Sequence, residues 1–131
     1  MSDEDKREVL ILVVLDVEET RDGIVSLFGA DGYRVDSARD EEGAVERARC
    51  DQPDLLLVGL GAPQVVVVAT ARRVRERAGL SEVVPIVIFC METIAEGAEL
   101  PLGEQTYVTR PDNFNQLRLF VARLLRGVAP S

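Results

Sequence analysis

Residues 9–16 read Val-Leu-Ile-Leu-Val-Val-Leu-Asp, an unbroken run of aliphatic side chains that ends in a carboxylate. A strand that alternates apolar and polar residues buries one face, whereas a strand that is apolar throughout is buried on both faces. The run therefore predicts a central strand of a parallel sheet that helices cover on both sides. Residues 54–60 and 85–89 are similarly apolar and are predicted to be further buried strands.

Stretches with helical spacing separate these apolar runs. The first extends from Thr20 to about Gly29, and the second follows Asp40, whose side chain is suited to cap a helix. Residues 64–78 are also predicted to be a helix, although the valines at 65–68 favour a strand by propensity. Helical spacing persists there over too many residues for a strand, through Val67, Ala71, Val74 and Ala78.

The C-terminal part of the chain is expected to add a strand and a helix. Residues 106–109 predict a fifth strand, and Asp112 or Asn113 is placed to cap a final helix that ends at Gly127. The inward stripe of this helix is expected to contain Phe114, Leu117, Val121, Leu124 and Leu125. Residues 91–103 have a weak pattern with two glycines and a proline, so any helix there is expected to be short or irregular.

Strands that alternate with helices in a short chain define a doubly wound α/β fold of the flavodoxin-like type. With a short edge strand over residues 33–37, we expect a parallel sheet of five strands in the order 2-1-3-4-5, in three layers. Ligands of such sheets bind where the strand order reverses, here after Leu15 and after Gly59. Residues 9–127 are expected to form the domain, with flexible tails at residues 1–8 and 128–131.

The composition limits both partners and chemistry. The 131 residues include 15 basic and 23 acidic side chains, a net charge of -8, so direct binding to nucleic acid or to an anionic membrane is not expected. The absence of histidine removes the commonest general base and metal ligand. The N-terminus is polar and acidic, unlike a signal peptide, and no apolar run approaches the roughly 20 residues that span a bilayer. A cytoplasmic location is therefore expected.

Several segments, taken in order, resemble the receiver domain of bacterial two-component response regulators, the CheY-like family. The resemblance extends from about Val9 to Arg126 and rests on the order and spacing of segments at residues 11–21, 32–33, 53–63, 85–90 and 107–111. It implies that an aspartate at the end of the third strand accepts a phosphoryl group from a histidine kinase. It also implies two acidic residues and Mg²⁺ nearby, a hydroxyl side chain after the fourth strand, and a lysine before a proline after the fifth.

Carried over position by position, the resemblance places altered residues in this phosphorylation pocket. Gly59 stands at the phosphoacceptor position and has no side chain, and Leu15 replaces the first acidic residue, so that only Asp16 remains of the pair. A single carboxylate offers little to Mg²⁺, which needs several oxygen ligands in near-octahedral geometry. We therefore expect neither a bound metal nor another cofactor.

The rest of the pocket is altered as well. Cys90 stands at the hydroxyl position and is a weak hydrogen-bond donor, and Met91 is expected to fill the space that a phosphoryl group would enter. Arg110 replaces the lysine and keeps its positive charge, but its guanidinium is larger and planar where the lysine ammonium is compact. We expect Arg110 to pair with Asp16 or with backbone carbonyls across the pocket, which would hold the switch in one state.

These positions predict a degenerate pseudo-receiver that is not an enzyme, cannot be phosphorylated, and acts as a protein interaction module. The resemblance implies a partner face made by helix four, strand five and helix five, which binds another protein or a second copy of the chain. Tyr107 keeps the aromatic switch position of this face. Phe120 falls outside the inward stripe and is expected to be an exposed contact, whereas Phe114 is expected to lie in the core.

Other functions remain open. A flavodoxin-like domain that binds a small molecule would use the same crevice, but the segment Asp16-Val-Glu-Glu-Thr20 is acidic where such a domain needs a phosphate cradle. A receiver with unconventional phosphorylation would need an acceptor such as Glu18 or Glu19. Nucleophilic chemistry at Cys90 is a further alternative, although no histidine is present to activate the thiol.

Overall fold

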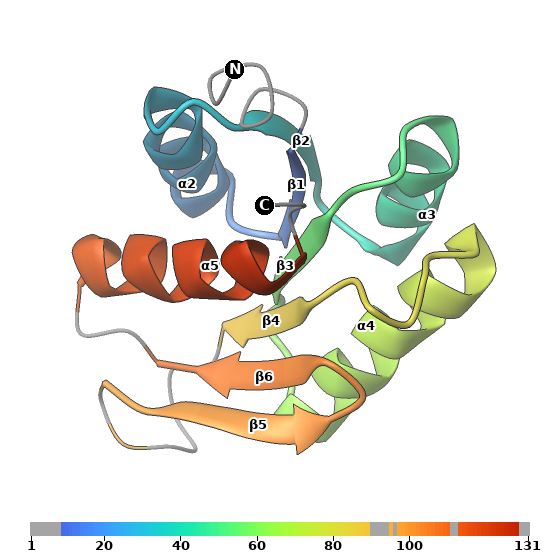
Figure 1. The fold of residues 1–131 in the computed structure, drawn as a ribbon. Helices are drawn as coiled ribbons and strands as arrows, with labels where there is room; N and C mark the ends of the chain where they lie inside the picture. Colours follow the sequence, from blue (N-terminus) through green and yellow to red (C-terminus); the bar gives the residue numbers. More distant parts are fainter. Residues whose placement is uncertain (1–8, 90–94, 96, 111–112, 129–131) are drawn as a thin grey trace.

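The computed structural model describes residues 9–89, 95, 97–110 and 113–128, and a twisted sheet runs through the middle of them (Figure 1). Its strands are β1 (Leu10–Leu15), β2 (Arg34–Ala38), β3 (Leu55–Gly59), β4 (Ile86–Phe89), β5 (Glu99–Gly103) and β6 (Thr106–Thr109). They lie in the order β2-β1-β3-β4-β6-β5. Among these strands β5 alone pairs in the antiparallel direction, so the other five bring their carboxyl ends to one edge.

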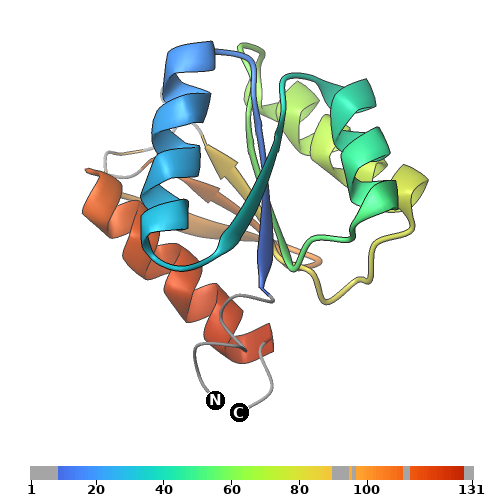
Figure 2. The ribbon, with the colours of Figure 1, turned by 90° about the horizontal axis from the view of Figure 1, so that it is seen from above.

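Two helices cover each face of the sheet, so the molecule has three layers (Figure 2). The helices are α2 (Glu18–Ala30) and α5 (Phe114–Val128) on one face, and α3 (Glu41–Cys50) and α4 (Gln64–Ala78) on the other. Side chains of β1 alternate between the two cores, because Ile11 and Val13 pack beneath α2 and α5 while Leu12 and Val14 pack beneath α3 and α4. All six residues of β1 are buried, as the apolar run predicts for a central strand.

The predicted fold class and the three layers are confirmed, and so is the helix over residues 64–78. This helix begins with four valines, whose propensity favours a strand. It is helical because that spacing buries Val67, Ala71 and Val74 in the core beneath α3 and α4. Within the described residues, no helix is long and apolar enough to cross a membrane.

The ends of the helices follow the expected caps closely. Asp40 accepts a hydrogen bond from the backbone N–H of Gly43 (2.8 Å), and Asn113 accepts one from the backbone N–H of Gln116 (2.9 Å). α5 continues to Val128, one residue beyond the expected boundary. The rest of the predicted tails, residues 1–8 and 129–131, lies outside the described residues.

The prediction of five parallel strands in the order 2-1-3-4-5 is wrong at one edge, where β5 adds a sixth strand. Residues 99–103 were expected to be part of a short or irregular helix, and they pair instead with β6. Leu100 lies opposite Val108, and Pro101 lies opposite Tyr107. A proline cannot continue a helix, but an edge strand tolerates it where its missing N–H would face solvent. Residues 90–94 and 96 of the same segment lie outside the described residues.

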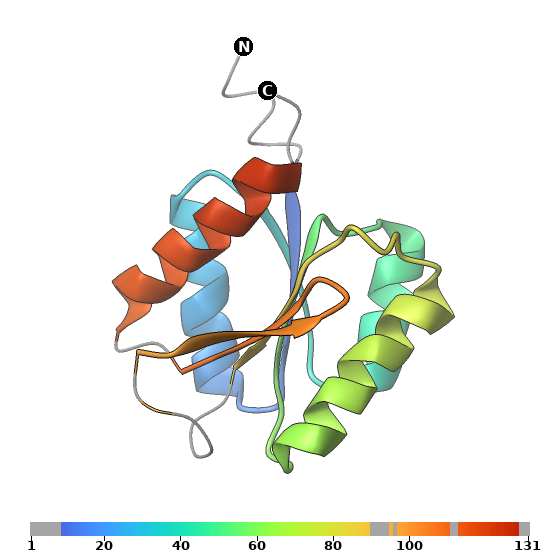
Figure 3. The ribbon, with the colours of Figure 1, turned by 60° about the horizontal axis from the view of Figure 1, so that its bottom comes forward.

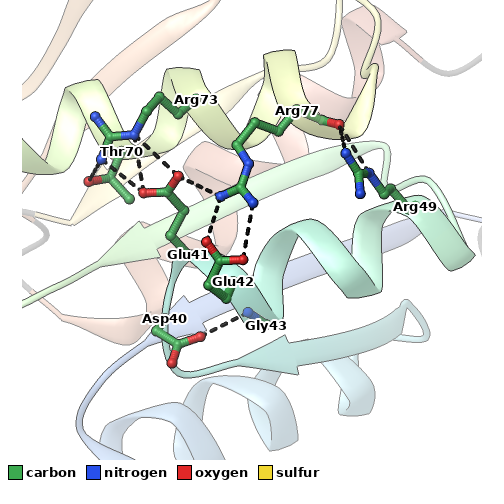
Figure 4. Close-up of polar contacts among 8 residues, drawn as sticks. All are labelled: Asp40, Glu41, Glu42, Gly43, Arg49, Thr70, Arg73 and Arg77. Atoms are coloured by element: carbon green, nitrogen blue, oxygen red, sulfur yellow. Dashed lines mark hydrogen bonds and ion pairs between the residues drawn. The ribbon is translucent and has the colours of Figure 1, made fainter.

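A cluster of ion pairs fastens α3 to α4 (Figure 4). Arg73 donates hydrogen bonds to the carboxylate of Glu41 (2.8 and 3.1 Å), and Arg77 donates to both Glu41 and Glu42 (2.9 Å each). Arg49 donates twice to the backbone carbonyl of Arg77. The hydrogen bonds from Arg73, reinforced by Arg77, hold the pKa of the Glu41 carboxyl below its ordinary value. The two helices are therefore linked by charge as well as by their apolar faces.

Acid is expected to weaken this link. Because the pKa of Glu41 is lowered in the folded state, its contribution to the free energy of unfolding is present above its ordinary pKa and is lost as the pH falls through the lowered value. The variant Arg73→Gln/Arg77→Gln should therefore be slightly less stable at neutral pH and show a smaller loss in acid, because exposed ion pairs contribute little to stability. Urea unfolding followed by circular dichroism measures both, and a loss that is independent of pH would contradict the expectation.

A second prediction concerns the end of α4. Gly79 follows the helix with a φ of 68°, in the left-handed region, and a Cβ atom there would have no neighbour within 4 Å. Gly79→Ala should therefore destabilise the fold by about 1 kcal/mol through backbone strain alone. The matched control is Gly23→Ala inside α2, where the added atom is equally unobstructed and should stabilise by about 0.5–1 kcal/mol. Shifts of the same sign in urea unfolding would contradict this explanation.

Candidate functional site

The carboxyl ends of β1 and β3 lie side by side at the crevice that the strand order predicts. Leu15 is the register partner of Gly59, and both are the last residues of their strands. Asp16 follows Leu15 directly and begins the connection to α2. The structure thus brings together Leu15, Asp16 and Gly59, three of the residues that sequence analysis assigns to the altered phosphorylation pocket.

The side chain of Leu15 fills the space above Gly59. A Cβ atom on Gly59 would lie 2.5 Å from Cδ2 of Leu15 and 3.0 Å from Cβ of Phe89, at the end of β4. A contact of 2.5 Å is essentially never found for a real Cβ atom, so any other residue at position 59 requires the end of the Leu15 side chain to move. Leu15 is only 3% exposed and belongs to the core beneath α2 and α5. The place of an acceptor carboxylate is therefore occupied by packed hydrocarbon.

Asp16 is exposed and links the β1–α2 connection to the β3–α4 connection by a hydrogen bond. Its Oδ2 accepts a hydrogen bond from the backbone N–H of Gly61 (2.8 Å), in the connection between β3 and α4. Nearby, the guanidinium of Arg21 donates to the backbone carbonyl of Leu15 (2.8 Å). Sequence analysis did not assign these roles to Gly61 or Arg21. The structure shows why glycine suits position 61, because a Cβ there would lie 3.2 Å from the Asp16 carboxylate, a distance that the sequence does not reveal.

Arg110 does not form the expected ion pair with Asp16. The ion pairs among the described residues do not include one between these two side chains, and the Asp16 carboxylate bonds to Gly61 instead. The backbone of Arg110 is engaged with the start of the β5 segment, because its N–H donates to the carbonyl of Ala98 (3.1 Å). Cys90 and Met91, the candidates that follow β4, lie outside the described residues.

The residues at the candidate site do not fit a Mg²⁺ ion. Leu15 and Gly59 contribute no side-chain oxygen, and Asp16 already accepts a backbone hydrogen bond. In the described ranges, no group of three or more acidic, cysteine or histidine side chains is placed to hold a metal. The metal-assisted chemistry implied by the resemblance therefore has no ligand set in this part of the structure.

The aromatic residues of the expected partner face differ from the prediction. Phe120 is buried, with 6% of its surface exposed, and packs edge-on against Tyr107 with ring centroids 5.8 Å apart. It lies three residues after Leu117 and so belongs to the wide apolar stripe of α5. Phe114, expected in the core, is 51% exposed because it occupies the first turn of α5. The predictions for Phe114 and Phe120 are thus both wrong.

Known sequences similar to this chain are bacterial regulators. The response regulator MprA of Mycobacterium tuberculosis is 27% identical over 124 residues, covering 93% of this chain and 53% of the relative. The transcriptional regulatory protein DltR of Streptococcus agalactiae is 30% identical over 107 residues, covering 82% of this chain and 47% of the relative. The chain therefore spans about half the length of these curated relatives. No family model matches it.

The fold is shared with solved receiver structures. The signal receiver domain of a histidine kinase from Syntrophus aciditrophicus superposes with a TM-score of 0.72 at 21% identity, and the match covers 94% of each chain. Together, the sequence relatives and the shared fold support a two-component response-regulator receiver domain of the CheY-like type.

The contact between Leu15 and Gly59 can be tested with a double-mutant cycle. Gly59→Ala should destabilise the domain by about 1–3 kcal/mol, because the new methyl group overlaps Leu15. Leu15→Ala should cost about 2–5 kcal/mol by leaving a cavity. The double variant should lose less than the sum by at least about 1 kcal/mol, since the methyl group then occupies that cavity. Gly61→Ala is the milder control, because its new methyl group meets only the carboxylate of Asp16. Losses in urea unfolding that simply add in the double variant would refute the contact between Leu15 and position 59.

Proposed function

We propose that the domain is a pseudo-receiver, a receiver-type module of two-component signalling that does not accept a phosphoryl group and acts by binding proteins. The observation that carries this proposal is the 2.5 Å approach of Leu15 Cδ2 to the Cβ position of Gly59. This contact supports the proposal, because glycine at position 59 offers no carboxylate and a larger residue there would displace Leu15.

The remaining carboxylates at this edge support the same conclusion. Phosphoryl transfer needs a positioned nucleophile and cationic groups that offset the charge of the transferred phosphate. Asp16 is hydrogen-bonded to Gly61 and lies beside the plugged position, not at it. Glu18 and Glu19, the candidates for unconventional phosphorylation, are exposed in the first turn of α2. These observations favour an inert domain over a receiver with a relocated acceptor.

The partner face in this proposal is the side of the molecule formed by β5, β6 and α5. β5 takes the place that sequence analysis gave to a fourth helix, and Tyr107 on β6 is half-buried beneath α5. The exposed apolar side chains of α5 are Phe114 and Leu119, at 51% and 59% exposure, and they replace Phe120 as the proposed contacts. Another protein, or a second copy of this chain, is the proposed occupant.

Incubation with acetyl phosphate and Mg²⁺ tests the proposal. We expect no increase of mass in intact-protein mass spectrometry, under conditions that phosphorylate an ordinary receiver run as the positive control. Mg²⁺ at millimolar concentration should also leave the melting temperature unchanged, since only a ligand that binds the folded state raises it. Stoichiometric phosphorylation of an aspartate or glutamate would overturn the proposal.

Restoring the acceptor provides the complementary test. Gly59→Asp should remain unphosphorylated, because the new side chain meets Leu15 and Phe89 at its first atom. Its free energy of unfolding should fall as well, by about 1–3 kcal/mol or more, as expected for overpacking with a partly buried charge. Efficient phosphorylation of this single variant would show that the pocket is open, contrary to the packing described above.

A further inference from the structure

The connection between β3 and α4 is unusually free of charge. Residues 55–71 contain no acidic or basic side chain, although 29% of the whole chain is charged. β3 explains the first part of this segment because it is buried. The second part is not buried, since residues 61–63 are exposed and Val65 and Val66 are 75% and 46% exposed. The start of α4 therefore presents valines to solvent where a surface helix normally carries polar residues.

A second exposed apolar residue lies next to this segment. The hydrogen bond from Gly61 to Asp16 joins the β3–α4 connection to the β1–α2 connection, and Val17 directly after Asp16 is 56% exposed. Both connections lie at the same end of the sheet (Figure 3). We call these exposed residues the edge patch, which consists of Val17, Ala62, Pro63, Val65 and Val66. Exposed apolar side chains that gather at one edge of a domain are typical of interaction sites.

Carboxylates lie on either side of Val17 in the chain, at the β1–α2 connection and in the first turns of α2. They are exposed and are called the acidic rim here, which consists of Asp16, Glu18, Glu19 and Asp22. In the described part of the chain none of the four takes part in an ion pair. Glu18 and Glu19 favour the first turn of α2 through the helix dipole, but this effect does not account for the neighbouring valines. An apolar centre with an unpaired acidic border is complementary to a ligand with the opposite charge and an apolar stripe.

We propose that the edge patch and the acidic rim bind an amphipathic helix with a basic face, supplied by a partner protein. Its apolar stripe would cover Val65 and Val66, and its lysines or arginines would pair with the rim. A second copy bound through the same surface is disfavoured, because the symmetric contact would bring two acidic rims together. Anionic lipid is disfavoured by the same charge. This inference rests on the proposed role as an interaction module and adds a surface and a partner chemistry to it.

The test uses a defined probe and matched variants. A fluorescein-labelled peptide of about five helical turns, with leucine on one face and lysine on the other, is titrated with the domain by fluorescence anisotropy. The same peptide with glutamate in place of lysine is the control probe. Val65→Ser/Val66→Ser should weaken binding of the lysine probe at least about tenfold, through lost apolar burial. Val83→Ser alters a valine that is 60% exposed elsewhere on the surface, and it should leave binding unchanged.

A second set of variants separates the effect of the acidic rim from that of the net charge of the protein. Glu18→Gln/Glu19→Gln should weaken binding several-fold and flatten its salt dependence, whereas Glu46→Gln/Glu76→Gln removes two exposed carboxylates away from the patch and should have little effect. Equal weakening by the two pairs would overturn the inference, because it would indicate attraction to the net charge of the protein alone. Absence of binding, or equal binding of the glutamate probe, would overturn it as well.

Two further results separate the possible failures. Sedimentation velocity that shows self-association abolished by Val65→Ser/Val66→Ser would identify a second copy as the occupant and would overturn the proposed partner chemistry. A domain that resists acetyl phosphate but ignores the lysine probe would overturn this inference while leaving the pseudo-receiver proposal intact. Circular dichroism of each variant shows that a loss of binding is not a loss of the fold.

Discussion

The packing of Leu15 over Gly59 is the constraint on which the rest of the sheet edge depends. The parallel register sets these two residues opposite each other at the ends of β1 and β3, and only a residue without a Cβ leaves room for the leucine. The leucine is in turn part of the core beneath α2 and α5, so it cannot turn outward without leaving a cavity. Leucine and glycine therefore form one structural unit, and the space between the ends of β1 and β3 belongs to the hydrophobic core.

The packing of Leu15 on Gly59 affects how a receiver-type domain could signal. A receiver that switches needs two states of comparable free energy, and a covalent group that favours one of them. Here the contact at the centre of the edge is apolar and closed, and the α3–α4 side is cross-linked by Arg73 and Arg77. Both features favour a single conformation. A rigid surface binds with less loss of conformational entropy, so these features are consistent with the proposed role in constitutive binding.

The sequence was sufficient for the buried elements and insufficient for the sheet edge and the surface. The apolar run of β1 and the spacing of Val67, Ala71 and Val74 predict their elements because burial against the sheet dominates local propensity. β5 escaped prediction because its pairing with β6 is a tertiary contact, and Pro101 reads as a breaker unless the strand is known to lie at an edge. Phe120 was misassigned because the apolar stripe of α5 is wider than a narrow seam.

At the candidate site, too, the sequence predicts what is local and misses what depends on contacts between distant segments. The missing side chain of Gly59 is visible in the sequence, but its occupation by Leu15 follows from register and packing, which depend on two strands far apart in the chain. Asp16 is a similar case, because its carboxylate accepts a hydrogen bond from the backbone N–H of Gly61 and not from the guanidinium that its charge suggests. Asp16, Glu18 and Glu19 take part in none of the ion pairs among the described residues, so this edge carries more negative than positive charge even with Arg21 nearby. On the proposed function, negative charge that a receiver gains by phosphorylation would here come from fixed side chains, and this is the electrostatic condition that binding of a partner without a phosphorylation signal would need.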